Sequence, residues 1–339
     1  MASDRDRAKN RLNGKKEFSR NTGRPDRRPH TGARLAGKPT AKPSADRAEP
    51  ESIQWFPGHM ARTRRKIREC LPQVDAVVEI VDARIPIASR NPEMDAMVGR
   101  KPRLVILNKA DLADEEATRR WIAYFRQKGT PALAVDCKSG RGFREFLPAL
   151  RDLLHDRVEK WEQQGVRHAI RAMIVGIPNV GKSSFINRLN TGGKAKVEDR
   201  PGVTRDNQWF VVEGAQLLDT PGVLWPKFED HTVALHLAFT GAIKDQVLDM
   251  EEMACELLGI LSDEYKPLLC ERYKLTDDIP TDRWELLQLI ARKRGMLLSG
   301  GEVHTERAAI MLLDEYRGGK LGRITLEWPP HREETPHDE

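Results

Sequence analysis

Short apolar runs recur through the middle of the chain, and stretches with helical periodicity lie between several of them. Most of these runs are nearly continuous in apolar character, which is typical of strands buried on both faces of a sheet. The predicted strands are Ala76–Val81, Leu104–Leu107, Ala132–Val135, Ala172–Val175, Trp209–Val212 and Gln216–Leu218. Glu115–Lys128 and Phe143–Gln164 are predicted helices. Strands that alternate with helices predict an α/β domain over residues 51–230, with a mostly parallel sheet and helices on both faces.

The pattern changes after residue 230. Apolar residues over 247–261 recur at helical spacing and predict a helix. A capping box at 282–285 starts another helix, and a third helix, near Glu306–Tyr316, ends at two glycines. Although Arg323–Glu327 has the pattern of a strand, the region as a whole predicts a small all-α domain over residues 231–339.

Residues 1–50 differ from the rest of the chain in charge. They contain 14 Lys or Arg against 6 Asp or Glu, a net charge of +8, whereas the remainder has a net charge of −2. The segment has few large apolar residues, so it cannot bury enough surface to offset the entropy of ordering. We therefore predict a disordered basic tail that contacts the phosphates of RNA. A solubilising extension with no fixed partner is the alternative.

With 339 residues, of which 39% are hydrophobic and 32% charged, the chain is long enough for two domains. No apolar run approaches the roughly 20 residues of a membrane span, and no apolar segment marks a secretory signal. The four cysteines form no CxxC pair, which argues against a zinc site or a disulfide framework and fits a reducing compartment. We expect a monomeric, cytoplasmic protein with no membrane partner.

The string GIPNVGKS at residues 176–183 fits the phosphate-loop template GxxxxGK[ST] without a mismatch. Gly176 and Gly181 permit a turn that directs successive N–H groups at phosphates. Lys182, which we assign a catalytic role, reaches the β- and γ-phosphates, and the Ser183 hydroxyl binds Mg²⁺. The predicted nucleotide contacts are Asn179, Val180, Gly181, Lys182, Ser183 and Ser184. The alternative is a glycine-containing turn between a strand and a helix.

A second string, DTPG at residues 219–222, ends another predicted strand. Asp219 suits the acidic residue that holds Mg²⁺, and the Gly222 N–H can bind the γ-phosphate and so respond to hydrolysis. By itself the string indicates only a turn, but its distance from the phosphate loop favours a switch. Thr204, in RPGVTRD between the two strings, is the predicted switch threonine, with a catalytic role and a place in the Mg²⁺ shell.

The string NKAD at residues 108–111 follows a third predicted strand and is typical of a guanine reader. The Asp111 carboxylate accepts hydrogen bonds from guanine N1–H and the 2-amino group. Adenine lacks both donors, so a site built around Asp111 discriminates by about 10⁴ or more. Asn108 braces neighbouring loops, and the Lys109 stem packs on the ring. The predicted contacts are Asn108, Lys109, Ala110, Asp111, Asp136 and Cys137, the last two from DCKSG, which resembles the loop that supports guanine O6.

The order of the three strings differs from that of an ordinary GTPase. The guanine reader here precedes the phosphate loop and the switches, so the sequence predicts a circularly permuted P-loop GTPase domain. Val223 follows the DTPG glycine, where many GTPases place a Gln that orients the attacking water. His59, in WFPGHMAR, is the candidate for this function, and an ordinary surface or capping histidine is the alternative.

Several longer strings resemble the ribosome biogenesis GTPase A (YlqF/RbgA) family of circularly permuted GTPases. These strings are IQWFPGHMARTRRKI, VDARIPIASRNP, GIPNVGKSSFINRL, DRPGVTRDNQW, LLDTPGVLWPKFED and TGAIKD. The likeness extends from about Ile53 through KLGRITLE, and the basic tail departs from it. The resemblance implies docking on a late precursor of the large ribosomal subunit, with the helical domain on rRNA and with hydrolysis that is slow until the ribosomal particle accelerates it.

The resemblance also implies two roles near the phosphates. A histidine at the position of His59 is catalytic in this family, and Asn179 matches an asparagine associated with K⁺ coordination in related GTPases. A monovalent cation there would stabilise charge that develops in the transition state. Two rival functions stay open: an RNA-binding assembly factor that keeps GTP as a structural ligand, and a signalling or transport GTPase that acts on a protein or a membrane.

Overall fold

The computed structural model describes residues 57–166, 168–191, 196–198, 208–222, 224–225, 228 and 230–330, with the backbone alone for 57–61, 191 and 196–198. The predicted basic tail, Thr204 and Val223 lie outside these residues. None of the described helices is long and apolar enough to cross a membrane.

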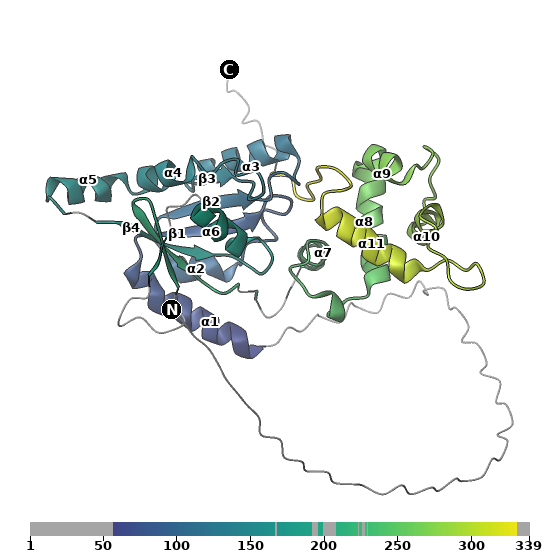
Figure 1. Cartoon of the computed structure of the whole chain (residues 1–339), viewed down its shortest axis with the longest axis horizontal. Helices are drawn as coiled ribbons and strands as arrows, with labels where there is room; N and C mark the ends of the chain where they lie inside the picture. The colour runs from purple at the N-terminus through teal and green to yellow at the C-terminus, as the bar shows by residue number, and fades with distance from the viewer. Residues whose placement is uncertain are drawn as a thin grey trace, which may run out of the picture. The chain divides into compact units, whose positions relative to one another are not determined.

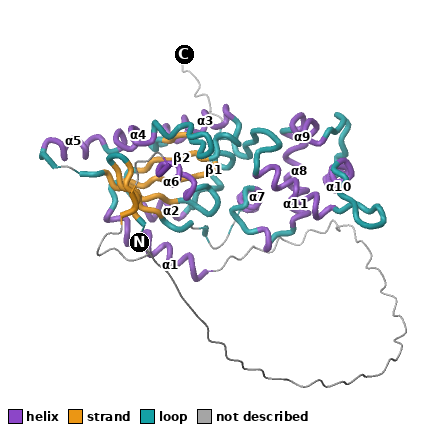
Figure 2. The backbone as a smooth tube through the Cα atoms, viewed as in Figure 1, coloured by secondary structure: helices purple, strands orange, loops and turns teal. Residues whose placement is uncertain are grey.

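A seven-stranded sheet is at the centre of the first part of the chain (Figures 1 and 2). Its strands are β1 (Ala76–Asp82), β2 (Arg103–Asn108), β3 (Ala132–Ala134), β4 (Ile170–Val175), β5 (Lys196–Glu198), β6 (Trp209–Val212) and β7 (Ala215–Asp219). They lie in the order β3-β2-β1-β4-β7-β6-β5. Pairing is parallel from β3 to β7 and antiparallel for β6 and β5. The mostly parallel sheet is confirmed, and β5 was not predicted.

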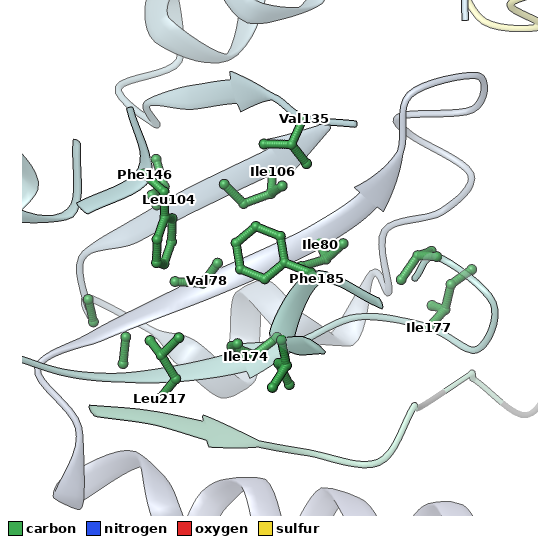
Figure 3. Packing of buried hydrophobic residues seen from close by; sticks show 14 of the residues in the cluster. Val78, Ile80, Leu104, Ile106, Val135, Phe146, Ile174, Ile177, Phe185 and Leu217 are labelled. Atoms are coloured by element: carbon green, nitrogen blue, oxygen red, sulfur yellow. The ribbon is translucent and has the colours of Figure 1, made fainter. Parts of the chain in front are cut away.

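Helices cover both faces of this sheet because its central strands are apolar on both sides. The helices are α1 (Pro57–Cys70), η1 (Leu71–Gln73), α2 (Glu93–Val98), α3 (Glu115–Gln127), α4 (Phe146–Leu153), α5 (His155–Gln163) and α6 (Lys182–Thr191). On one face, Val78 and Ile106 pack with Phe146 of α4 and Phe185 of α6 (Figure 3). The opposite face packs against α1, α2 and α3, where Trp121 of α3 is buried.

The single helix predicted over Phe143–Gln164 is wrong, because the chain forms α4 and α5 with a break at Leu154. Leu154 is buried in the core with φ −112° and ψ 17°, which is not helical. Burying this side chain takes precedence over continuing the helix. None of the residues of α5, all of which the structure describes, is buried.

The second part of the chain contains α7 (His231–Phe239), η2 (Asp245–Val247), α8 (Met250–Glu264), α9 (Lys266–Tyr273), α10 (Arg283–Lys293) and α11 (Thr305–Arg317). Leu257, Ile290 and Leu312 are fully buried in their shared core. The predicted capping box is confirmed at its first half, because the Asp282 carboxylate accepts a hydrogen bond from the Glu285 N–H at 2.9 Å. The predicted fold class is therefore confirmed. The division between domains at residue 230 stays a prediction.

The strand predicted at Arg323–Glu327 is wrong. These residues form an extended segment outside the sheet, whose backbone bonds to two loops of the first part of the chain. The helices α2, α7 and α9 were not predicted.

Candidate nucleotide site

Parallel pairing places the ends of β1, β2, β4 and β7 at one edge of the sheet. Asp82 is in register with Asn108, and Ile174 is in register with Asp219. Ligands of open α/β sheets bind beyond this carboxyl edge. A cavity of about 320 Å³ lies there. It is lined by Pro178, Lys182, Ser183, Gln208, Asp219, Thr220, Pro221 and Gly222. Two of the three strings, GIPNVGKS and DTPG, therefore meet in one cavity.

The phosphate loop connects β4 to the start of α6 with a backbone that most residues do not adopt. Asn179 has φ 66° and Gly181 has φ 93°. Glycine enters this left-handed region without steric cost, and asparagine tolerates it better than most residues. A Cβ at Gly181 would collide with the side-chain nitrogen of Asn108. The loop opens a helix N-terminus, where free N–H groups and the helix dipole favour an anion.

Lys182 is buried at the base of this loop. Its ammonium donates to the carbonyl oxygens of Gly176 at 3.0 Å and Ile177 at 2.7 Å. Burial lowers the pKa of Lys182 to about 8, and the nearby Asp219 carboxylate opposes this change. A phosphate beside this buried ammonium would favour its charged form. Ser183 and Ser184 are exposed on the first turn of α6.

The DTPG string lies against the phosphate loop. Thr220 donates its hydroxyl to the Ile174 carbonyl at 2.6 Å. A Cβ at Gly222 would come within 2.9 Å of both the Lys182 ammonium and the Pro178 backbone nitrogen. Such close packing explains why a glycine occupies this position.

Asp219 has the chemistry of a cation ligand. Its Oδ1 atom is buried, and among the described residues no group donates a hydrogen bond to it. Burial raises the pKa of Asp219, with Lys182 opposing the change. An unpartnered carboxylate oxygen beside an exposed serine hydroxyl, that of Ser183, is a donor set that suits Mg²⁺.

Asn108 joins the NKAD loop to the phosphate loop. Its side-chain nitrogen donates to the Val180 carbonyl at 2.7 Å, and its side-chain oxygen accepts from the Cys137 thiol at 3.1 Å. One buried amide therefore connects three loops. Burial raises the pKa of the Cys137 thiol to about 11, so this group stays a protonated donor.

The other base-loop residues lie around Asn108. The Asp111 carboxylate is a quarter exposed, 3.4 Å from the Lys138 ammonium. Asp136 accepts hydrogen bonds from the backbone N–H groups of Lys138 and Ser139. Burial by itself would raise the pKa of Asp136, but these hydrogen bonds outweigh it and lower the pKa. The Asp136 side chain therefore shapes its own loop.

Sequence reasoning missed a buried charge network behind the base loop. Asp82, at the end of β1, pairs with Arg84 at 2.8 Å and with Lys109 at 2.9 Å. Burial alone would raise the pKa of Asp82, but the two cations hold it well below its usual range. The available signal was the charged pair in VDAR, at the end of a strand that is otherwise apolar except for Glu79.

The comparisons with known proteins agree with this geometry. A family model described as a 50S ribosome-binding GTPase matches residues 171–281. The chain is 49% identical over 279 residues to the ribosome biogenesis GTPase A of Bacillus cereus, covering 82% of this chain and 94% of that protein. The protein of the same name from Priestia megaterium is 47% identical over 286 residues, with 84% and 99% covered. The chain belongs to the ribosome biogenesis GTPase A family.

A solved member of the same family supports the permuted fold. The crystal structure of GNP-bound YlqF from T. maritima has a TM-score of 0.54 and 28% identity, covering 79% of this chain and 98% of that chain. The stretch matched by the 50S ribosome-binding GTPase model begins within β4, after the NKAD loop. The circular permutation is confirmed. As a member of this family, the protein binds guanine nucleotide and hydrolyses GTP to GDP and phosphate.

Three residues that the sequence analysis singled out lie partly or wholly outside the described residues. His59 lies within α1, but its side chain is outside the described residues. Thr204 and Val223 are outside them altogether. The amide of Asn179 is described, and it donates to the Gly241 carbonyl at 2.8 Å. This contact with the turn after α7 was not predicted.

Proposed function

We propose that this GTPase is an assembly factor acting late in the maturation of the large ribosomal subunit. Its relatives are named for ribosome biogenesis, and the matching family model is described as a 50S ribosome-binding GTPase. The observation that carries the proposal is the likeness, over most of the chain, to relatives named for ribosome biogenesis. The use of GTP is supported by the Asn108 amide, which bonds to the phosphate loop. The partners are then rRNA and ribosomal proteins of the precursor, and the location is the cytoplasm.

The proposed residue roles follow from the geometry of the loops. Lys182 and Gly222, which lie close together in the lining of the cavity, hold the β- and γ-phosphates. The phosphate-loop contacts are Asn179, Val180, Gly181, Ser183 and Ser184. Asp111 accepts from the guanine base, while the backbone of Asp136 and Cys137 supports guanine O6. Asn108, Lys109 and Ala110 complete the base site.

Ser183, Asp219 and Thr204 are the proposed ligands of Mg²⁺. The buried and unpartnered oxygen of Asp219 supports this assignment. A bound Mg²⁺ supplies charge neutralisation at the phosphates. The amide oxygen of Asn179 is the proposed K⁺ ligand, because its nitrogen is already engaged by Gly241.

Hydrolysis then needs a group that orients water, since Val223 cannot. His59 is the proposed catalytic residue, and large-subunit particles are proposed to stimulate turnover. We expect purified large-subunit precursors to raise GTP turnover. The variant His59→Ala should lose this stimulation and keep its affinity for GDP, whereas His155→Ala, at an exposed histidine of α5, should behave as wild type.

Two outcomes would contradict these proposals separately. Turnover that does not respond to precursor particles contradicts the stimulated reaction and favours an RNA-binding factor with GTP as a structural ligand. Full stimulation of His59→Ala contradicts the role of His59 alone. Co-sedimentation of the GTP-analogue complex with membranes rather than large-subunit precursors would indicate the signalling or transport alternative.

A further inference from the structure

Residues 319–328, which we call the strap, return from the end of α11 to the loops that follow β1 and β2. The Ile324 N–H donates to the Leu112 carbonyl at 3.0 Å. The Asp114 N–H donates to the Thr325 hydroxyl oxygen at 2.9 Å. Ile324 and Thr325 are both buried. The strap is therefore packed against the residues that directly follow NKAD.

Arg323 reaches further along the same loop. Its guanidinium donates to the carbonyl oxygens of Ala110 at 3.1 Å and Asp111 at 3.3 Å. A third nitrogen donates to the Glu115 carboxylate, at the start of α3, at 3.0 Å. The planar guanidinium presents several donors in a fixed geometry, so it holds these three groups in one arrangement. Two of the three groups belong to the guanine-reading string itself.

The base loop is held on a second side by the buried network. Lys109 pairs with Asp82, and Asp82 pairs with Arg84. Arg84 donates to the Tyr316 carbonyl of α11 at 3.3 Å and stacks 5.0 Å from the centre of its ring. Two sets of contacts therefore connect the NKAD string to the end of α11 and to the strap. One is made by Arg323, and the other passes through Asp82 and Arg84.

The far end of the strap is anchored as well. The Glu327 carboxylate accepts from the N–H groups of Ile87, at 2.6 Å, and Ala88, at 3.0 Å. It also lies 3.1 Å from Nδ1 of His236 on α7. The Glu327 carbonyl accepts from the indole of Trp121 at 2.7 Å. These contacts hold the far end of the strap, so both of its ends are fixed.

We propose that Arg323 is a positioning residue for guanine specificity, which fixes the Asp111 carboxylate through its backbone. This inference rests on the proposed role of Asp111 as the base reader. A carboxylate accepts the two guanine donors together only when its orientation is fixed, because a bidentate pair is geometrically demanding. Without Arg323, Asp111 loses part of its discrimination while the phosphate contacts persist.

The test compares GDP with inosine diphosphate, which lacks the 2-amino group, on the full-length protein. We expect Arg323→Ala to weaken GDP binding by at least about tenfold. The reason is that the charged guanidinium no longer donates to the carbonyl oxygens of Ala110 and Asp111. Inosine diphosphate binding should weaken less, so the ratio of the two dissociation constants falls. Arg323→Lys should restore part of this ratio, since an ammonium can still donate to one carbonyl.

Arg272→Ala is the matched control. Arg272 is similarly exposed and donates to the Glu315 carboxylate at 2.9 Å, within the helical region. It should leave the ratio unchanged even if it lowers the melting temperature. Thr325→Val provides a second variant should Arg323→Ala fail to fold, since it removes only the hydroxyl that accepts from the Asp114 N–H. It should lower the ratio in the same direction.

The inference and the proposed function fail in distinguishable ways. An unchanged ratio in a folded Arg323→Ala protein, or in Thr325→Val if Arg323→Ala does not fold, overturns the role of the strap. A wild-type protein that binds GDP and inosine diphosphate equally instead overturns the assignment of Asp111. Equal loss of both ligands in Arg323→Ala also overturns the inference, because it indicates general damage to the site.

Discussion

At the scale of single residues, the site is built from buried polar groups, each with few available hydrogen-bond partners. Asn108 uses both ends of its amide, on Val180 and on Cys137. Lys182 is buried among carbonyl oxygens, and the buried oxygen of Asp219 has no donor among the described residues. An unpaired buried polar group is costly, so the Asp219 oxygen suits a ligand. The hydrogen bonds of Asn108 and Lys182 instead hold the loops together.

The proposed base preference rests on the Asp111 carboxylate. Replacing Asp111 with Asn exchanges an acceptor for a donor at the position facing the 2-amino group of guanine. We expect Asp111→Asn to shift preference from GDP towards xanthosine diphosphate by about two to three orders of magnitude. The new donor no longer matches the 2-amino group of guanine but matches the oxygen that xanthine carries at the same position. Competition binding with both diphosphates measures this shift. Asp152→Asn, on the exposed side of α4, is the control, and an unchanged preference in Asp111→Asn contradicts the assignment.

At the scale of elements, the phosphate loop is held in place by the two elements that flank it, β4 and α6. β4 is buried between β1 and β7, so the loop starts from a fixed point. Phe185 packs edge to face on Phe146, with ring centres 5.1 Å apart, and anchors α6 on the sheet. The loop between these two fixed elements is held in its left-handed turns.

The variant Gly181→Ala tests this loop. It places a methyl group at φ 93° and against the Asn108 amide, so it costs about 1–3 kcal/mol of strain and displaces the bond to Val180. We expect at least about a tenfold loss of GDP affinity, measured by titration. Gly129→Ala also strains a left-handed residue, at φ 74°, but its Cβ meets open space. If both variants bind GDP like wild type, the proposed loop geometry is contradicted.

The sequence predicted the features that depend on adjacent residues. It missed the features that depend on contacts between residues far apart in the chain. The phosphate loop and the capping box at Asp282 rely on a few adjacent residues, so both were visible in the sequence. α7 was missed because its own residues are apolar on nearly every side, so they form no single apolar stripe at helical spacing. Within the strap, Arg323–Glu327 was predicted to be a strand because its alternation resembles one. Its partners, Leu112 and Arg84, lie in loops far away in the sequence, and nothing local indicates them.

At the scale of the whole molecule, three of the connections between the nucleotide loops and the helical region concern the nucleotide directly. The chain passes from the DTPG string towards α7, Asn179 bonds to Gly241 after α7, and the strap contacts the NKAD loop. In an ordinary GTPase, the chain continues from DTPG back into the sheet. The permuted order thus supports our hypothesis that loss of the γ-phosphate repositions the helical region.

Hydrogen exchange tests this coupling. We expect amides in residues 245–330 to exchange at different rates with GDP and with a GTP analogue, because the three connections respond to the γ-phosphate and the base loop. Residues 155–163, which form α5, serve as an internal reference that should not change. Identical exchange over 245–330 in both nucleotide states, on and off the ribosomal particle, would remove the basis for the hypothesis.

The adjacency of β1 and β4 also affects how the chain acquires its structure during synthesis. These strands pair in the centre of the sheet, although α2, β2, α3, β3, α4 and α5 lie between them in the chain. Pairing across such a separation slows folding, because a long loop must close first. The base-reading half leaves the synthesising ribosome before the phosphate-binding half exists. A nascent chain therefore cannot capture GTP until both halves of its sheet have emerged and paired.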